Sequence, residues 1–182
     1  PPCKERAERK SASLMASGNH IIRSEGISVH LFSGCMGSGH GHVAPLHIDV
    51  FLKDRAFMTD SGRFTYLDSA KRTYYRSAEA HNIPKLQGEY THKPSGSWSF
   101  SSIGETSRGY MSERMGYELI RAENHAYAGL TVRRTVLKLD PSHFVIIDEF
   151  ISEDTVKAEA LFHLHPDCTI HDNAIENHGE TM

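Results

Sequence analysis

The chain has 182 residues, which is enough for one domain with one hydrophobic core. Its 20 lysines and arginines are balanced by 23 aspartates and glutamates, so the basic excess of nucleic-acid-binding proteins is absent. A nucleic-acid partner is therefore not expected. No apolar run approaches the ~20 residues that cross a bilayer, so a membrane is not an expected partner either. The three cysteines form no Cys-x-x-Cys pair, which argues against a zinc ribbon or a dithiol redox site. Histidine is unusually frequent, with 13 residues, and histidines bind metals and transfer protons.

Strands dominate the predicted elements. Residues 1–13 are polar and basic, and we expect a linker or the tail of a preceding helical domain there. From Leu14 onward, short apolar or alternating runs predict strands over 21–22, 27–32, 46–52, 56–59, 117–121, 130–139, 144–151 and 156–165, with a turn or two of helix over 69–77. This pattern predicts an all-β fold, a large antiparallel β-sandwich over residues 14–182. Because 170–182 is polar and ends abruptly, we expect the sandwich to be either compact or truncated.

The residues best suited to chemistry begin with a glycine-rich loop over 37–42, which carries His40 and His42. Asp60 follows 18 residues after His42, at the end of an apolar run, and His81 follows 21 residues later. Two imidazoles and one carboxylate from three separate segments suit a divalent transition metal, zinc first. The spacing also allows a structural interpretation, in which the loop histidines bond to backbone, Asp60 caps a turn and His81 belongs to the core.

Five sequence features occur in a defined order. They are the Gly-His-Gly-His loop at 39–42, the apolar strand at 46–52, Asp-Ser-Gly at 60–62, Tyr-Arg-Ser at 75–77 and His-Asn at 81–82. In this order they resemble the heparinase II/III family of polysaccharide lyases, whose members cleave heparin, heparan sulfate or alginate. The resemblance covers most of residues 14–166, and its first half is more specific than the hairpin pattern of its second half.

The resemblance implies a helical (α/α) toroid followed by a large β-sandwich, and we expect the toroid to be absent from this chain. It implies a metal, usually zinc, held inside the sandwich by His42, Asp60 and His81. It also implies that His40 faces the substrate cleft and helps to neutralise a uronate carboxylate. Arg63 is an expected contact for a sugar carboxylate or sulfate, because its planar guanidinium matches such groups. Further candidates for the same cleft are Tyr66, Tyr74 and Arg76.

One position departs from the family pattern. Many family members carry an aspartate two residues past the second loop histidine, where this chain has Ala44. A carboxylate at that position is suited to orienting a metal ligand, so its loss weakens the expected metal site. His47 and Asp49 are the nearby candidates for replacing it.

The implied reaction is β-elimination on a uronic acid. The carboxylate is neutralised, a base removes the C5 proton, and an acid protonates the departing glycosidic oxygen. In the family, the tyrosine that moves the proton lies on the toroid, beside an asparagine or histidine. We therefore expect this chain alone to have little or no lyase activity, and its partners to be an acidic polysaccharide and the helical domain of the same protein. The sequence leaves the oligomeric state open, including a homo-oligomer, and shows no signal peptide, although family members are often periplasmic or secreted.

Two other functions fit parts of the pattern. A carbohydrate-binding sandwich without catalysis predicts exposed aromatic residues on one sheet face, and Trp98, Phe100 and Tyr110 are candidates. A cupin-like metal enzyme also carries histidines and carboxylates on strands. The Asp-Ser-Gly-Arg turn and the Arg-Ser and His-Asn motifs that follow it argue against the cupin-like interpretation.

Overall fold

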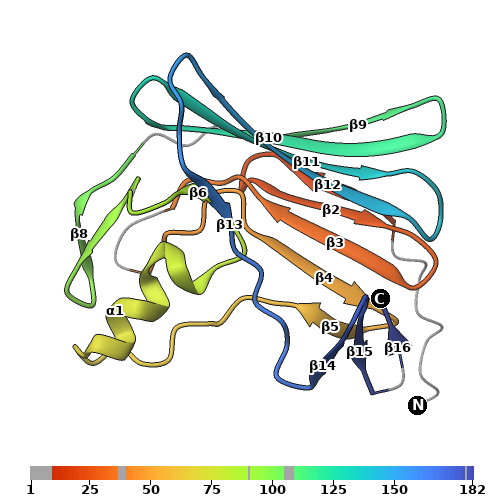
Figure 1. The fold of residues 1–182 in the computed structure, drawn as a ribbon, viewed down its shortest axis with the longest axis horizontal. Coiled ribbons are helices and arrows are strands. Elements are labelled where there is room, and N and C mark those ends of the chain that lie inside the picture. The colour runs from red at the N-terminus through yellow and green to blue at the C-terminus, as the bar shows by residue number, and fades with distance from the viewer. Residues whose placement is uncertain (1–9, 37–39, 90, 105–108, 179) are drawn as a thin grey trace.

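Two antiparallel sheets face each other and form the body of the molecule (Figure 1). The computed structural model describes residues 10–36, 40–89, 91–104, 109–178 and 180–182. The first sheet has the order β1 (Ala12–Leu14), β2 (Asn19–Arg23), β3 (Ile27–Phe32), β4 (Ile48–Leu52) and β5 (Arg55–Met58). The second sheet has the order β12 (Phe144–Ser152), β11 (Leu130–Lys138), β10 (Tyr117–Tyr127) and β9 (Tyr110–Arg114). The expected antiparallel β-sandwich is therefore confirmed.

Smaller elements cover one end of the two sheets. They are α1 (Ala70–Arg76), the 3₁₀ turn η1 (Ala78–Ala80), the pair β6 (Pro84–Leu86) and β13 (Ala158–Ala160), and the hairpin β7 (Lys93–Ser95) and β8 (Ser99–Ser102). A meander of β14 (Cys168–His171), β15 (Ala174–Asn177) and β16 (Glu180–Thr181) follows β13. The short helix lies where 69–77 predicted it, whereas β1, β6, β7, β8, β9 and the final meander lie outside the predicted strands.

The sheets meet in one apolar core. Strand alternation points Ile22, Leu31 and Ile48 of the first sheet toward Ile120 and Val132 of the second, and all five side chains are buried in one cluster. Burying a side chain of this size contributes roughly 1.5–3 kcal/mol. The core therefore fixes which face of each strand points outward.

The first sheet begins close to the N-terminal end of the described residues. Its strand β1 starts at Ala12 and pairs with β2. Residues 1–9, which hold most of the expected linker, lie outside the described residues. Within the part of the chain that the structure describes, no helix is long and apolar enough to cross a membrane.

His20 of β2 is a buried histidine that makes folding depend on pH. Its side chain has no exposed surface, and its ring nitrogens lie 2.9 Å from Ser13 Oγ and 3.1 Å from Ser33 Oγ. Burial, together with the nearby His30, lowers the pKa of His20. The unfolded chain therefore takes up a proton at His20 as the pH falls through about 6.5, whereas the folded chain takes it up only at a lower pH.

We expect the free energy of unfolding to fall as the pH is lowered from 7 to 5, because the unfolded state binds more protons in that range. Urea unfolding at both pH values measures this fall. The variant His20→Gln removes one titrating group and should show a smaller fall. Equal pH dependence in the two proteins would contradict the assignment of a neutral, buried His20.

Candidate metal centre and adjoining cleft

Three side chains from separate segments converge at the end of the first sheet. His42 lies in the loop before β4, Asp60 follows β5, and His81 follows η1. One ligand atom from each of the three lies within 4.8 Å of the other two. The structure thus brings together the three residues that the family resemblance implies, although positions 37–39 of the glycine-rich loop lie outside the described residues.

The most buried member of this triad is His81. Its Nδ1 lies 2.7 Å from Asp60 Oδ2, and the centroid of its ring lies 5.3 Å from that of His42. Its side chain has no exposed surface, and its Nε2 has no hydrogen-bond partner among the described residues. A buried polar atom without a partner is costly, and such atoms are rare in folded proteins. This free nitrogen, beside a second imidazole and a carboxylate, fits a divalent transition metal.

The protonation states of His42 and Asp60 suit metal binding. Burial, and then the neighbouring His81, lower the pKa of His42 to about 4, so its imidazole is neutral at pH 7. Burial on its own raises the pKa of the Asp60 carboxyl, but the hydrogen bond with His81 and the charges of His81 and His47 bring it below its ordinary value. Metal ligands must be deprotonated, so neither group has to lose a proton to bind a metal at neutral pH.

A polar group on the outer face of the first sheet supports the triad. Asp49 of β4 accepts a hydrogen bond from the backbone N–H of Asp60 at 3.0 Å, and its Oδ1 lies 3.2 Å from Nε2 of His47. Burial raises the pKa of the Asp49 carboxyl, but hydrogen bonds with His30 and His47 hold it well below its usual range. Both of the residues expected to replace the missing carboxylate at Ala44 therefore lie beside the triad.

Asn82 and Arg134 attach this region to the two sheets. The side-chain amide of Asn82 donates to the carbonyl oxygens of Ile48 at 2.9 Å and Thr59 at 3.3 Å, which ties the His81 segment to β4 and to the end of β5. The buried guanidinium of Arg134 in β11 donates to the carbonyl oxygens of Asn82 at 2.6 Å and Leu46 at 2.9 Å. The second sheet thus supports the backbone next to His81.

Arg72, a buried residue of α1, holds two surface turns together. The helix begins at Ala70, and the Ser69 side chain caps it by accepting from the Arg72 N–H. The buried guanidinium of Arg72 donates to the carbonyl oxygens of Arg63 at 3.1 Å and Ser97 at 3.3 Å. Arg72 therefore fixes the position of the turn that carries Arg63 relative to the turn that carries Trp98.

Arg76 lies one turn later on the same helix face, because residues four apart share a face. Its guanidinium donates to the carbonyl oxygens of Gly96 at 2.5 Å and Gly41 at 3.4 Å, and it lies 4.2 Å from the ring centroid of Phe100. The side chain has no exposed surface. The expectation that Arg76 lines the substrate cleft is therefore corrected: Arg76 anchors the histidine loop and is covered by the β7–β8 hairpin.

A stacked group of side chains lies on the surface beside His40. The guanidinium of Arg63 lies 3.8 Å from the ring centroid of Tyr66, and Tyr66 stacks on Trp98 with centroids 4.8 Å apart. Nδ1 of His40 lies 3.1 Å from the Tyr66 hydroxyl, and the His40 ring meets Trp98 edge-on at 5.4 Å. His40 is exposed, and half of the Trp98 surface is exposed. These four residues form what we call the stacked platform.

The other candidate aromatic residues lie outside the stacked platform. Tyr74 is exposed on α1 and meets Tyr75 edge-on, while Tyr75 stacks with Phe64. Phe100 lies under Arg76, and Tyr110 is exposed on β9 of the second sheet. The carbohydrate-binding interpretation expected exposed aromatic residues on one sheet face. Trp98, Phe100 and Tyr110 do not share such a face.

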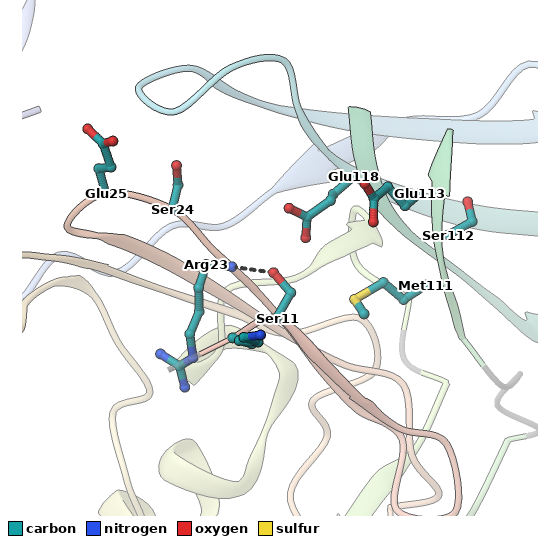
Figure 2. A pocket seen from close by; sticks show the side chains of 9 residues that line it. Ser11, Arg23, Ser24, Glu25, Met111, Ser112, Glu113 and Glu118 are labelled. Atoms are coloured by element: carbon teal, nitrogen blue, oxygen red, sulfur yellow. Dashed lines mark hydrogen bonds between the residues drawn. The ribbon is translucent and has the colours of Figure 1, made fainter. Parts of the chain in front are cut away.

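Two clefts differ in their relation to the triad. A cleft of about 750 Å³ includes Asp60 and runs along Tyr75, Phe162 and His163. A second cleft of about 660 Å³, seen in Figure 2, lies between the residues just before β1, the end of β2, β9 and β10, and shares no residue with the triad. Its lining side chains carry both charges, and include Lys10, Arg23, Glu25, Glu113 and Glu118. The first cleft is therefore the one that joins the candidate metal centre.

Comparison with known proteins identifies the family to which this chain belongs. A family model described as heparinase II/III-like, C-terminal, matches residues 6–180. The chain belongs to this family. As a heparinase II/III-like C-terminal domain, it carries its histidine loop, Asp-Ser-Gly turn and His-Asn dipeptide at one end of the sandwich, as described above. The resemblance drawn from the sequence is thus confirmed.

Solved structures show the same fold. A heparan sulfate lyase from Pedobacter heparinus is 20% identical, with a TM-score of 0.72 over 92% of this chain and 27% of that chain. A gene product described as heparinase III is 17% identical, with a TM-score of 0.71 over 92% of this chain and 26% of that chain. The heparinase II/III-like chain thus spans about a quarter of the length of these structures. No curated protein sequence matches it.

Proposed function

We propose that this chain forms the metal-bearing wall of the substrate cleft of a polysaccharide lyase, which cleaves uronic-acid-containing polysaccharides by β-elimination. The observation that carries the proposal is the convergence of His42, Asp60 and His81, because His42 lies two residues past His40, which belongs to the stacked platform. The family membership and the fold shared with a heparan sulfate lyase support a substrate of the heparin, heparan sulfate or alginate type.

The reaction needs positive or hydrogen-bonding groups near the uronate carboxylate. When a base removes the C5 proton, the electron pair forms a C4–C5 double bond, the C4–O bond breaks and the departing oxygen takes a proton. Charge builds on the carboxylate during this step, so donors already in place stabilise it. His40 and Arg63 are the exposed groups of this kind in the stacked platform, and Tyr66 holds both of them.

His42, Asp60 and His81 would hold zinc as a structural ion. When bound, it would supply a positive charge that links three chain segments. The residues of this chain then determine where His40 lies: His42 is two positions further along the loop, and Arg76 holds Gly41 between them. Tyr74 contacts Tyr75, which lines the cleft that includes Asp60, so Tyr74 would extend the substrate-binding surface.

The remaining wall of the cleft would come from a helical domain of the same protein. The described residues contain one α-helix of seven residues, too little for a helical toroid, and 92% of this chain covers only 27% of the matched heparan sulfate lyase. The acid and base of the reaction would lie on that domain. We therefore expect binding of acidic oligosaccharides by this chain, with little or no elimination.

A carbohydrate-binding role without catalysis is the second candidate, and the exposed, stacked Trp98 favours it. Aromatic faces of this kind bind sugar rings in either function. Absorbance of the unsaturated product separates the two, because only the lyase generates a C4–C5 double bond once the helical domain is joined to this chain.

Trp98 is the only tryptophan of the chain, so its fluorescence reports on the stacked platform directly. We expect an unsulfated uronate tetrasaccharide to change this fluorescence and a neutral tetrasaccharide to leave it unchanged. Arg63→Ala should weaken binding about 10-fold or more, because a hydrogen bond to a charged group contributes roughly 1.5–3 kcal/mol. Arg114→Ala, on the distant β9, is the matched control. Equal affinities for wild type and Arg63→Ala would remove Arg63 from the proposed cleft.

A further inference from the structure

Asp49 lies where three donors from separate segments meet. The side chains of Ile48 and Val50 point into the core, so Asp49, between them on β4, points to the outer face of the first sheet. Its Oδ1 accepts from the backbone N–H of Asp60 at 3.0 Å and lies 3.2 Å from His47 Nε2. Its Oδ2 lies 2.9 Å from Nδ1 of His30 on β3. Both oxygens of the carboxylate are therefore engaged.

The tautomer of His47 follows from its partners. The backbone N–H of Asn82 donates to His47 Nδ1 at 3.1 Å, so this nitrogen carries the lone pair and the proton lies on Nε2. Nε2 lies 3.2 Å from Asp49 Oδ1 and 3.8 Å from Asp60 Oδ2. The His47 side chain is almost fully buried, with its ring centroid 5.8 Å from that of His81. The hydrogen-bond partner of the His47 N–H is thus Asp49, the nearer of the two carboxylates.

His30 holds the far side of the same carboxylate. Its Nε2 lies 2.9 Å from Asn19 Oδ1, and the Asn19 amide nitrogen donates to Ser17, which fixes the orientation of that amide. Both ring nitrogens of His30 therefore face acceptors, Asn19 on one side and Asp49 on the other. A polar row runs from β2 across β3 and β4 to Asp60 and ends at the triad.

We propose that Asp49, together with His47, is a positioning residue of the candidate metal centre. Asp60 lies two residues past the end of β5, and its backbone N–H is held by the Asp49 side chain rather than by a strand partner. Without the Asp49 carboxylate, this N–H loses its acceptor and His47 Nε2 retains only Asp60 as a nearby carboxylate. The His47 N–H then competes with the metal for Asp60. This inference rests on the metal site proposed above.

Zinc affinity of the full chain tests the role of Asp49. The variant Asp49→Asn keeps the size of the side chain but turns a donor toward His30 or His47. We expect its zinc affinity, measured by competition with a chromophoric chelator, to fall 10- to 100-fold. Cobalt gives a second readout, because the visible absorption of bound Co²⁺ changes when the ligand geometry changes. A purely structural role of Asp49 would lower the thermal stability of the metal-free chain without altering the cobalt spectrum of the folded chain.

Asp140→Asn is the matched control. Like Asp49, Asp140 accepts from the backbone and contacts a histidine ring: it accepts the N–H groups of Ser142 and His143 and contacts the His143 ring. It lies, however, in the turn between β11 and β12. The Asp140→Asn variant should bind zinc with the affinity of the wild-type chain. If Asp49→Asn does not fold, His47→Gln tests the same contact from the donor side, with an expected loss of at least several-fold.

The outcomes separate this inference from the proposed function. A wild-type chain that takes up neither zinc nor cobalt defeats the metal site itself, and the positioning role with it. A wild-type chain that binds zinc, with Asp49→Asn binding it equally well and giving the same cobalt spectrum, defeats the positioning role alone. Weaker binding by Asp49→Asn, with Asp140→Asn unchanged, supports both.

Discussion

Zinc should stabilise the wild-type chain, and the variant His42→Ala should lose this effect. A ligand at 100 times its Kd that binds only the folded state contributes about 2.7 kcal/mol. For a domain of this size, about 2–4 °C of melting temperature accompany each kcal/mol, so Tm should rise by about 5–11 °C. His42→Ala leaves only Asp60 and His81, and we expect its Tm to be almost independent of zinc. Thermal unfolding followed by circular dichroism measures both proteins.

His40→Ala is the control for this experiment, because it removes the other histidine of the same loop. His40 contacts Tyr66 and Trp98 and is no member of the triad, so this variant should keep the full zinc-dependent rise in Tm. Equal zinc-dependent shifts in wild type and His42→Ala would show that the ion binds elsewhere among the 13 histidines.

Replacing Arg134 with methionine should destabilise the whole domain. Its guanidinium is fully buried and forms two hydrogen bonds of 2.7 Å to the carboxylate of Asp148. It also donates to the backbone carbonyls of Leu46 and Asn82. Removing one partner of a buried ion pair costs about 3–5 kcal/mol, since the other charge is left unpaired. Urea unfolding should show this loss, and the segment that carries His81 should open first in hydrogen exchange.

Arg133→Met supplies the matched control. Arg133 is the neighbouring residue of β11, points to the opposite face and pairs with Glu123 and Glu149 at the surface. Its replacement should have a small effect, as for other surface ion pairs. The double variant Arg134→Met, Asp148→Leu removes both buried charges and should recover part of the lost stability. An Arg134→Met protein as stable as Arg133→Met would contradict the anchoring role.

The strands that face the core were predictable from alternation. In β11, Leu130, Val132 and Val136 are apolar at every second position, and the same period places Arg134 on the buried face. That signal was present in the sequence and identifies Arg134, not Arg133, as the inward arginine. The final meander gave no such signal, because its few apolar residues show no clear alternation. It attaches to β5 through the hydrogen bond from the Asn177 amide to the Ala56 carbonyl.

The site was only partly predictable. Spacing alone left the roles of His42, Asp60 and His81 open, and the family resemblance implied their convergence. The burial of Arg76 could not be read from the sequence, because it depends on the β7–β8 hairpin that covers α1. The contact between Asp49 and the Asp60 backbone likewise requires the bend of the chain after β5, which no local pattern determines.

The location of a bound metal tests the account most directly. A crystal of the chain grown with zinc, measured on both sides of the zinc absorption edge, gives an anomalous difference map. We predict one strong peak at about 2.0–2.2 Å from a ring nitrogen of His42, a ring nitrogen of His81 and a carboxylate oxygen of Asp60. A map without density between these three side chains, or with its strongest peak at other histidines, would contradict the account.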